Sequence, residues 1–152
     1  MSPVERFSFI AIRRPQSLTS RLLMFLAGVK DLMAFDVYVD EVDLVLGTTG
    51  LYRYKNDFNR AVWLAWFCVD PKARGRGIGQ ALLDHSVALA RDAGFGVMRL
   101  YTSTDPNEAS AQRLYETNGF MEVGRKKGLH STTVFREKKI DQGKHSLAAA
   151  GT

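Results

Sequence analysis

An apolar run that passes directly into a glycine-rich turn is the feature that most limits how this chain can fold. Every position from Ala61 to Val69 is apolar, which is typical of a central strand covered on both faces of a sheet. Asp70 and Pro71 end the run, a glycine-rich turn follows at 74–79 (Arg-Gly-Arg-Gly-Ile-Gly), and an amphipathic helix comes next. This order predicts an α/β fold with a mixed, central β-sheet flanked by helices.

The rest of the chain supplies further elements for such a sheet. Apolar patterning and turn residues predict strands at 7–13, 37–39, 44–54, 97–104, 120–124 and 132–137, and helices within 17–34, 82–94 and 105–119. Gly47 and Gly50 fall inside one predicted strand and indicate a β-bulge. Asp105, Pro106 and Glu108 have the spacing of an N-cap, a first-turn proline and the third residue of a capping box.

Length and composition indicate one globular domain. The 152 residues are 45% hydrophobic and 24% charged, and we expect a single domain at 1–139 with a disordered polar tail at 140–152. No stretch reaches the roughly 18 apolar residues of a membrane span. The first residues do not have the pattern of a signal peptide. We therefore expect a cytoplasmic protein with no membrane partner.

Cysteine and histidine give no sign of a metal site. Cys68 is the only cysteine, and its apolar neighbours predict a buried structural thiol. His85, His130 and His145 are too far apart in sequence for a zinc motif. We therefore expect neither an intramolecular disulfide nor a bound metal.

The glycine-rich turn at 74–79 has the properties of a phosphate-binding site. A helix that begins there leaves several backbone N–H groups unpaired. Gly75, Gly77 and Gly79 let an anion approach the backbone, and Arg74 and Arg76 add positive charge. The net charge of +5 also favours an anionic partner. A basic loop without a ligand is the alternative interpretation.

Two nucleotide-binding folds fit the same turn less well. A Rossmann site expects an acidic residue about 20 positions further on, where this chain has Arg99, Leu100 and Tyr101. A P-loop ends in Gly-Lys-Ser/Thr, which the turn lacks. Both nucleotide interpretations are weakened.

The turn resembles the cofactor motif of the GNAT acetyltransferase superfamily: Gln or Arg, two residues, Gly, one residue, then Gly or Ala. Arg74, Gly77 and Gly79 match it. The later helix and strand are also similar to the family, at Asn107, Ala111, Leu114, Tyr115, Gly119 and Phe120. The resemblance covers residues 61–125, and the order of elements extends it back to residue 7.

This resemblance implies acetyl-CoA as the acetyl donor and assigns its binding residues. The strand before the turn would splay from its neighbour and expose its backbone to the pantetheine arm, and the amides of the turn would hold the pyrophosphate. The implied binding residues are Phe67, Cys68, Val69, Arg74, Gly75, Arg76, Gly77, Ile78 and Gly79. A main-chain N–H near Cys68 or Val69 would polarise the thioester carbonyl. Asn107 would contact the cofactor or serve only the first turn of its helix.

The implied reaction is direct attack of a neutral primary amine on the thioester in a ternary complex. The acceptor would be a small molecule or a protein amine, and Tyr115 would be the acid that protonates the leaving thiolate. Alternatively, Tyr115 shares a helix face with Ala111 and Leu114 that packs on the sheet. The general base is unassigned, because Leu64 stands where some relatives carry glutamate. Water, or a carboxylate from the segment 41–43, could accept the proton.

Two other functions fit parts of the sequence. A nucleic-acid-binding module would explain the positive charge and the basic run at 125–127, but the chain has no recognisable module motif. An acyl-CoA sensor would keep the cofactor site without turnover.

Strict alternation along 61–69 also places Trp63 and Trp66 on opposite faces of the strand. The resemblance further implies that two copies can pair into a homodimer through their C-terminal strands.

Overall fold

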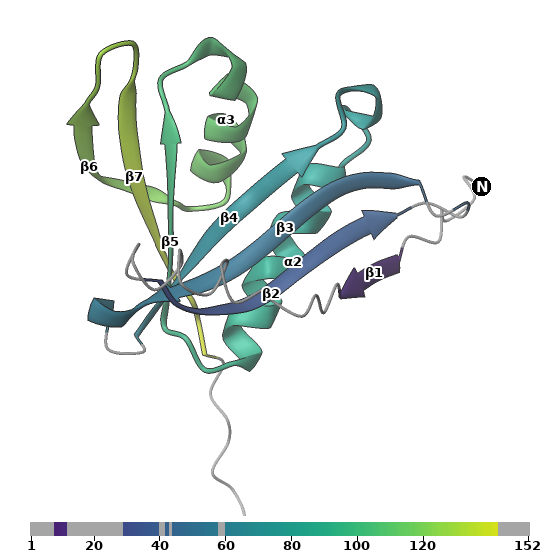
Figure 1. The fold of residues 1–152 in the computed structure, drawn as a ribbon, viewed down its shortest axis with the longest axis horizontal. Coiled ribbons are helices and arrows are strands. Elements are labelled where there is room, and N and C mark those ends of the chain that lie inside the picture. The colour runs from purple at the N-terminus through teal and green to yellow at the C-terminus, as the bar shows by residue number, and fades with distance from the viewer. Residues whose placement is uncertain (1–7, 12–28, 40–41, 43, 58–59, 143–152) are drawn as a thin grey trace, which may run out of the picture.

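The backbone is organised around one seven-stranded sheet with the order β1-β2-β3-β4-β5-β7-β6 (Figure 1). The computed structural model describes residues 8–11, 29–39, 42, 44–57 and 60–142. The strands are β1 (Ser8–Ala11), β2 (Val29–Val39), β3 (Val45–Tyr54), β4 (Ala61–Val69), β5 (Val97–Ser103), β6 (Met121–Lys127) and β7 (Thr132–Lys139). The helices are α2 (Ile78–Asp92) and α3 (Ala109–Thr117). Short 3-10 turns lie at Lys55–Asp57, Pro71–Ala73 and Pro106–Glu108.

The sheet divides between β4 and β5. These two strands are parallel and pair at three positions, Ala61 with Val97, Val62 with Met98, and Trp63 with Arg99. Beyond Trp63 no further pairing joins the described residues of the two strands, and they diverge as Figure 1 shows. Antiparallel pairs build both halves, with β1 to β4 on one side and β5, β7 and β6 on the other.

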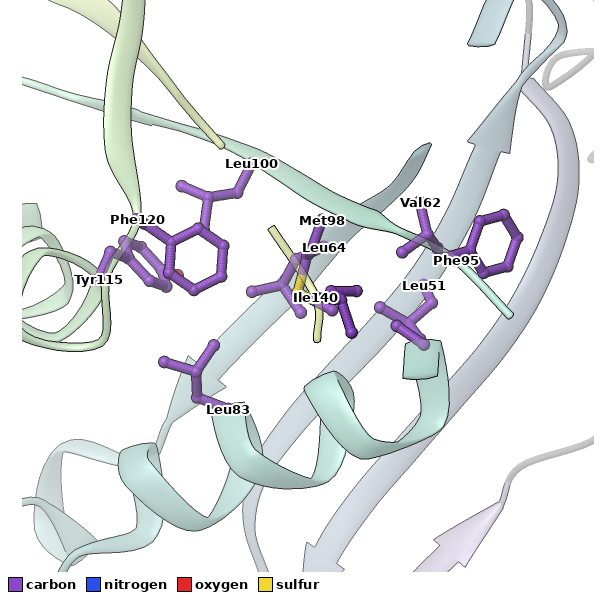
Figure 2. Close-up of a cluster of buried hydrophobic side chains, with 11 residues drawn as sticks. Leu51, Val62, Leu64, Leu83, Phe95, Met98, Leu100, Tyr115, Phe120 and Ile140 are labelled. Carbon is purple, nitrogen blue, oxygen red and sulfur yellow. The ribbon is translucent and has the colours of Figure 1, made fainter. Parts of the chain in front are cut away.

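Helix α2 covers one face of the sheet with a stripe of buried residues. Leu82, Leu83 and Ala90 are almost fully buried at near-helical spacing. Leu83 and Ala90 belong to the core that Figure 2 shows between the helix and the strands, and that includes Leu51, Val62, Leu64, Met98, Leu100, Tyr115 and Phe120. Leu82 belongs to a second cluster, with Leu46 and Ile78. Each fully buried aliphatic or aromatic side chain there contributes about 1.5–3 kcal/mol. The buried hydroxyls of Thr49 and Ser86 satisfy each other at 2.7 Å.

The predicted α/β architecture is confirmed, and several elements agree closely. The buried strand runs over Ala61–Val69 as expected, and Gly94 and Gly119 follow the ends of α2 and α3 with φ of 86° and 81°. Register shifts occur beside Gly47 and Gly50, where the β-bulge was expected. Ile140, in the segment expected to be a tail, is 5% exposed. Its N–H donates to Gly96 O at 2.8 Å.

The prediction of helix within 17–34 is wrong for residues 29–34. Residues 12–28 lie outside the described residues, but 29–34 belong to strand β2. This segment pairs with β3 from Val29 onward. Sheet pairing on that edge outweighs a helical spacing that rests on only a few apolar positions.

Strand β4 was expected to be buried on both faces, but only its first half is buried. Ala61, Val62 and Leu64 are buried, whereas Trp66 is 51% exposed and Cys68 is also exposed. The prediction of a buried thiol at Cys68 is therefore wrong. The physical reason is the divergence of β5, which removes the neighbour that would have covered the end of β4.

Gly47 lets α2 approach β3 closely, and its replacement tests that packing. A Cβ at this position would lie 2.7 Å from Leu82 Cδ1 and 2.8 Å from the Cys68 carbonyl oxygen. We expect Gly47→Ala to destabilise the protein by about 1–3 kcal/mol, because the backbone oxygen cannot move aside cheaply. Urea unfolding measures the change.

The matched control is Gly124→Ala, a strand glycine whose added Cβ meets nothing within 4 Å. It should leave the unfolding midpoint nearly unchanged. Equal effects of the two substitutions would show that close packing at Gly47 is not the cause.

Candidate functional site

The glycine-rich turn joins the end of β4 to the start of α2. The Asp70 N–H donates to Leu46 O at 2.8 Å, and Asp70 Oδ1 accepts the Lys72 N–H at 2.8 Å. These bonds fix the chain where it leaves the sheet. Gly75 and Gly77 then take φ of 78°, a left-handed conformation that costs other residues about 1–2 kcal/mol.

The start of α2 presents backbone donors with no side-chain cap. Gly77 is the N-cap residue and supplies no side-chain hydrogen bond. The unpaired N–H groups of the first turn and the helix dipole favour an anion there. Arg74 and Arg76 are both exposed beside this turn. The turn therefore combines uncapped backbone donors with exposed positive charge.

Helix α3 packs against the beginning of α2 at Gly79. A Cβ on this glycine would be 3.4 Å from Leu114 Cδ2 and 3.8 Å from Val69 Cγ2. Next to it, Gln80 Nε2 donates to Asn118 Oδ1 at 2.8 Å, and Asn118 Nδ2 donates to Gln80 Oε1 at 3.0 Å. This amide pair fixes α3 relative to the glycine-rich turn. It was not predicted, because its partners are 38 residues apart.

Two cations on β7 also hold the C-terminal end of α3. Arg136, which is 5% exposed, donates from Nη2 to Glu116 Oε1 at 2.6 Å. Lys138 Nζ donates to Asn118 O at 2.6 Å, at the C-terminal end of the helix. Helix α3 is therefore tied both to α2 and to the second half of the sheet.

A cleft of about 550 Å³ lies where β4 and β5 diverge. Its lining comes from four elements and the turn before α3: Tyr52, Tyr54, Leu64, Ala65, Trp66, Phe67, Leu100, Tyr101, Thr102, Glu108, Ala111 and Tyr115. The end of β4 borders this cleft with a backbone edge that β5 does not pair. Of the predicted site residues, the cleft therefore brings together Phe67 and Tyr115.

Tyr115 lies deep in the cleft, between two aromatic rings. Its ring centroid is 5.7 Å from Phe67 and 5.7 Å from Phe120. Its hydroxyl has no hydrogen-bond partner within the part of the chain that the structure describes. Burial, and then the nearby charge of Glu108, raise the pKa of Tyr115 well above its usual value. The phenol therefore stays protonated and can donate.

Glu108 does not form the expected capping box. Its carboxylate accepts hydrogen bonds from the Thr102 hydroxyl, from Ser103 N at 2.7 Å and from Ser103 Oγ at 2.8 Å. The Asp105 N–H, the expected partner, donates instead to Ser103 Oγ at 3.2 Å. The short 3-10 turn before α3 turns Glu108 back toward β5, so the carboxylate lines the cleft.

Hydrogen bonding keeps Glu108 ionised. Partial burial alone would raise the pKa of this carboxyl, but the bonds from Thr102 and Ser103 bring it below its usual value. Sequence reasoning missed this residue as part of the site. The Asp-Pro-Asn-Glu spacing is equally typical of a helix start, and the sequence contains no signal that separates the two roles.

Aromatic side chains form the face of the cleft away from the helices. Tyr52 is 4% exposed, and its ring centroid lies 5.1 Å from Tyr54, 6.3 Å from Trp63 and 5.9 Å from Trp66. The two tryptophans therefore both contact Tyr52, and the expectation of opposite faces is wrong. Trp66 has φ of 51° and lies in a β-bulge, which interrupts the alternation of the strand.

The remaining predicted residues lie on β4, at the start of α2 and on the turn before α3. Val69 is half-buried beside Gly79, and Ile78 is buried at the start of α2. Asn107 is exposed, and its N–H donates to Asp105 Oδ1 at 2.8 Å. Leu64 is a buried core residue, so this position of β4 supplies no base.

The described residues include neither a side-chain cluster suited to a metal ion nor a helix that could span a membrane. Among them, no group of three or more His, Cys, Asp or Glu side chains is arranged to hold an ion. No helix in the same part of the chain is long and apolar enough to cross a membrane.

Comparison with known proteins points to one family. Residues 34–122, more than half of the chain, match the model of the acetyltransferase (GNAT) domain. A mycothiol acetyltransferase of Beutenbergia cavernae is 42% identical over 55 residues, which cover 36% of this chain and only 18% of that protein.

Solved structures share the fold at low sequence identity. A protein described as an acetyltransferase of the GNAT family from Desulfovibrio desulfuricans has a TM-score of 0.71 at 18% identity, covering 90% of this chain and 100% of its own. A GNAT family acetyltransferase from Elizabethkingia anophelis, solved with acetyl-CoA bound, has a TM-score of 0.66 at 12% identity, covering 88% and 97%.

The amide pair between α2 and α3 is open to a double-mutant cycle. We expect Gln80→Ala and Asn118→Ala each to destabilise the protein, and the double variant to lose less than their sum. The coupling should be about 0.5–3 kcal/mol, because the two side chains bond each other directly. Urea unfolding of the four proteins gives the coupling energy.

The control cycle replaces Gln80 and Gln142, because Gln142 Nε2 donates to Phe95 O beyond the far end of α2, a bond that does not involve Gln80. A coupling no larger than that of the control pair would contradict the role assigned to the amide pair.

Proposed function

This chain belongs to the GNAT acetyltransferase family, and we propose that it transfers an acetyl group from acetyl-CoA to a primary amine by direct attack in a ternary complex. One observation carries the proposal. A cleft at the division of the sheet contains a protonated phenol, Tyr115, and the helix that bears it packs against an uncapped, glycine-rich helix start.

The site fits an acyl-CoA donor. The start of α2 offers backbone N–H groups and nearby arginines to the pyrophosphate, and no Cβ obstructs Gly75 or Gly77. Phe67, Cys68 and Val69 lie on the part of β4 that β5 does not pair, so backbone groups are available to the pantetheine amides. Acetyl-CoA would supply the activated acetyl thioester. The relative solved with acetyl-CoA bound supports this choice.

Tyr115 is suited to protonate the leaving thiolate. Its hydroxyl borders the cleft, has no described hydrogen-bond partner and stays protonated because its pKa is raised. A thiolate that departs beside it can take its proton. Asn107, exposed on the turn before α3, would contact the same donor from the outside.

The attacking amine must be neutral, so it loses a proton before or during attack. Its reference pKa is about 10 if it resembles lysine. Since Leu64 occupies the middle of β4, we assign deprotonation to water in the cleft. The mycothiol acetyltransferase supports acetyl transfer in general, but the chain matches only 18% of its length.

A negative charge at the turn should block the donor. We expect Gly77→Glu to weaken acetyl-CoA binding at least about tenfold, because a carboxylate beside the pyrophosphate repels it. Isothermal titration calorimetry with acetyl-CoA measures the affinity.

Gly94→Glu is the control, since Gly94 lies at the other end of α2 with φ of 86° and open space around its Cβ. It carries the same strain and charge away from the turn and should bind acetyl-CoA normally. If both variants bind equally, the pyrophosphate does not lie at Gly77.

Removing the Tyr115 hydroxyl should slow the reaction without loosening the donor. We expect Tyr115→Phe to lower kcat about 100-fold, within the range of general acid catalysis, and to leave acetyl-CoA affinity unchanged. Free thiol release across a panel of amines gives kcat. Undiminished turnover would exclude Tyr115 as the acid, and an absence of turnover in the unmodified protein would favour an acyl-CoA sensor.

The pH profile tests the protonation state that the acid role requires. Because the pKa of Tyr115 lies above its usual value, the phenol keeps its proton past pH 10. The unmodified protein should therefore lose no activity from tyrosine ionisation below about pH 10. A downward limb near pH 9 that disappears in Tyr115→Phe would contradict the raised pKa.

A further inference from the structure

We propose that the aromatic face of the cleft is the acceptor site, and that it selects a small, singly cationic primary amine with an apolar or aromatic body, for which Glu108 is the counter-ion. This inference rests on the proposed acetyl transfer and specifies its substrate class. The aromatic wall is defined here as Tyr52, Tyr54, Trp66 and Tyr101, all of which line the cleft.

The cleft reaches both faces of the sheet. Leu100 and Tyr101 are consecutive in β5 and point to opposite faces. Leu100 is 1% exposed in the core with α2, whereas Tyr101 is 56% exposed. Tyr115 approaches the cleft from the helix side, which also carries the glycine-rich turn. The aromatic wall therefore lies on the side of the cleft opposite the proposed donor site, where the acceptor can bind. The two substrates would meet where the sheet divides.

The aromatic wall is held open by its own contacts. Tyr52 is buried at its centre, its hydroxyl donates to Tyr54 Oη at 3.3 Å, and the Tyr54 ring meets it edge-on at 5.1 Å. Trp66 is held in the bulge, where the Thr48 hydroxyl donates to its carbonyl oxygen at 2.7 Å. Large aromatic surfaces exposed in a concave site are typical of ligand contact. Their faces attract cations.

The charge of the cleft also favours a cationic acceptor. Glu108 is the one acidic residue in the described lining, which contains no lysine or arginine. Its carboxylate is fixed by Thr102 and Ser103 and cannot swing away. Asp57 is not part of the lining, pairs with Arg99 at 2.7 Å and accepts a 2.7 Å hydrogen bond from Trp63 Nε1. The lining therefore offers one carboxylate to a single ammonium, and a carboxylate on the acceptor would find no cationic partner in it.

Volume limits the size of the acceptor. About 550 Å³ must hold both the reacting end of the donor and the amine, and sites for drug-sized molecules occupy about 300–1,000 Å³. An arylalkyl or short alkyl amine fits this space beside a thioester. A sugar amine would place many hydroxyls against the aromatic rings and leave them without hydrogen bonds.

Matched amines test this selection with the full-length protein. The probes are 2-phenylethylamine, phenylalanine, which adds a carboxylate to the same body, and glucosamine, which replaces the apolar body with hydroxyls. We expect kcat/KM for 2-phenylethylamine to exceed both others at least about tenfold. Thiol release at saturating acetyl-CoA gives the three values.

Variants of the cleft test the two recognition elements separately. We expect Glu108→Gln to raise KM for 2-phenylethylamine about tenfold, because the ammonium loses its counter-ion. The ratio of kcat/KM for 2-phenylethylamine to that for phenylalanine should fall, because the carboxylate of phenylalanine is no longer repelled by Glu108. Trp66→Leu should raise the same KM, and Trp66→Phe should restore it by returning an aromatic face. Acetyl-CoA affinity should change in none of them.

Glu122→Gln is the matched control, because Glu122 pairs with Arg125 at 2.6 Å outside the cleft. Glu122→Gln should leave the ratio of kcat/KM for the two amines unchanged. Partial unfolding of Glu108→Gln would lower kcat/KM for both amines equally, so it would not narrow this ratio. If Glu108→Gln is unstable, the Trp66 pair still decides the proposal.

The outcomes separate this inference from the proposed function. Acetyl-CoA binding with thiol release, but with phenylalanine or glucosamine preferred, would overturn the acceptor class and leave acetyl transfer intact. An unchanged ratio of 2-phenylethylamine to phenylalanine in Glu108→Gln, together with an unchanged KM for 2-phenylethylamine in Trp66→Leu, would do the same. Failure of acetyl-CoA to bind would overturn both proposals.

Discussion

The short parallel pairing of β4 with β5 is the constraint on which the rest of the site depends. It ends at Trp63 and Arg99, and the Arg99 guanidinium reinforces that end. Its Nη1 lies 2.7 Å from Asp57 on the connection before β4, and its Nε lies 2.9 Å from Glu137 on β7. One half-buried cation thus joins both halves of the sheet at the point where they begin to diverge. Past it, β5 no longer pairs with β4, and the cleft opens.

The helices convert this division into a site with two sides. Gly79 lets α3 pack on the start of α2, and the amide pair of Gln80 and Asn118 fixes their relative position. Tyr115 is carried by α3 and lies between Phe67 of β4 and Phe120. The glycine-rich turn and the phenol are therefore set by one packed unit. The aromatic wall belongs to the strands, so donor and acceptor sides rest on different elements.

The sequence predicted well those parts that local patterns determine. The bounds of β4, the glycine-rich turn and the ends of both helices follow from apolar runs, glycines and prolines that act within a few residues. It could not predict where pairing stops or where a bulge forms. Cys68 is exposed because β5 leaves, and Trp66 turns toward Tyr52 because of its bulge. Likewise 29–34 is strand because β3 pairs with it. These depend on contacts distant in sequence.

Electrostatics connects the two sides of the cleft. Burial and the charge of Glu108 raise the pKa of Tyr115, while hydrogen bonds from Thr102 and Ser103 lower the pKa of Glu108. Two titratable groups in one cleft are thus driven in opposite directions, one kept neutral and one kept charged, an arrangement that favours distinct roles in acid–base chemistry. The same carboxylate that adds to the effect of burial on the phenol is the counter-ion that we propose for the amine. A cationic acceptor would therefore be drawn to the part of the cleft that also contains Tyr115.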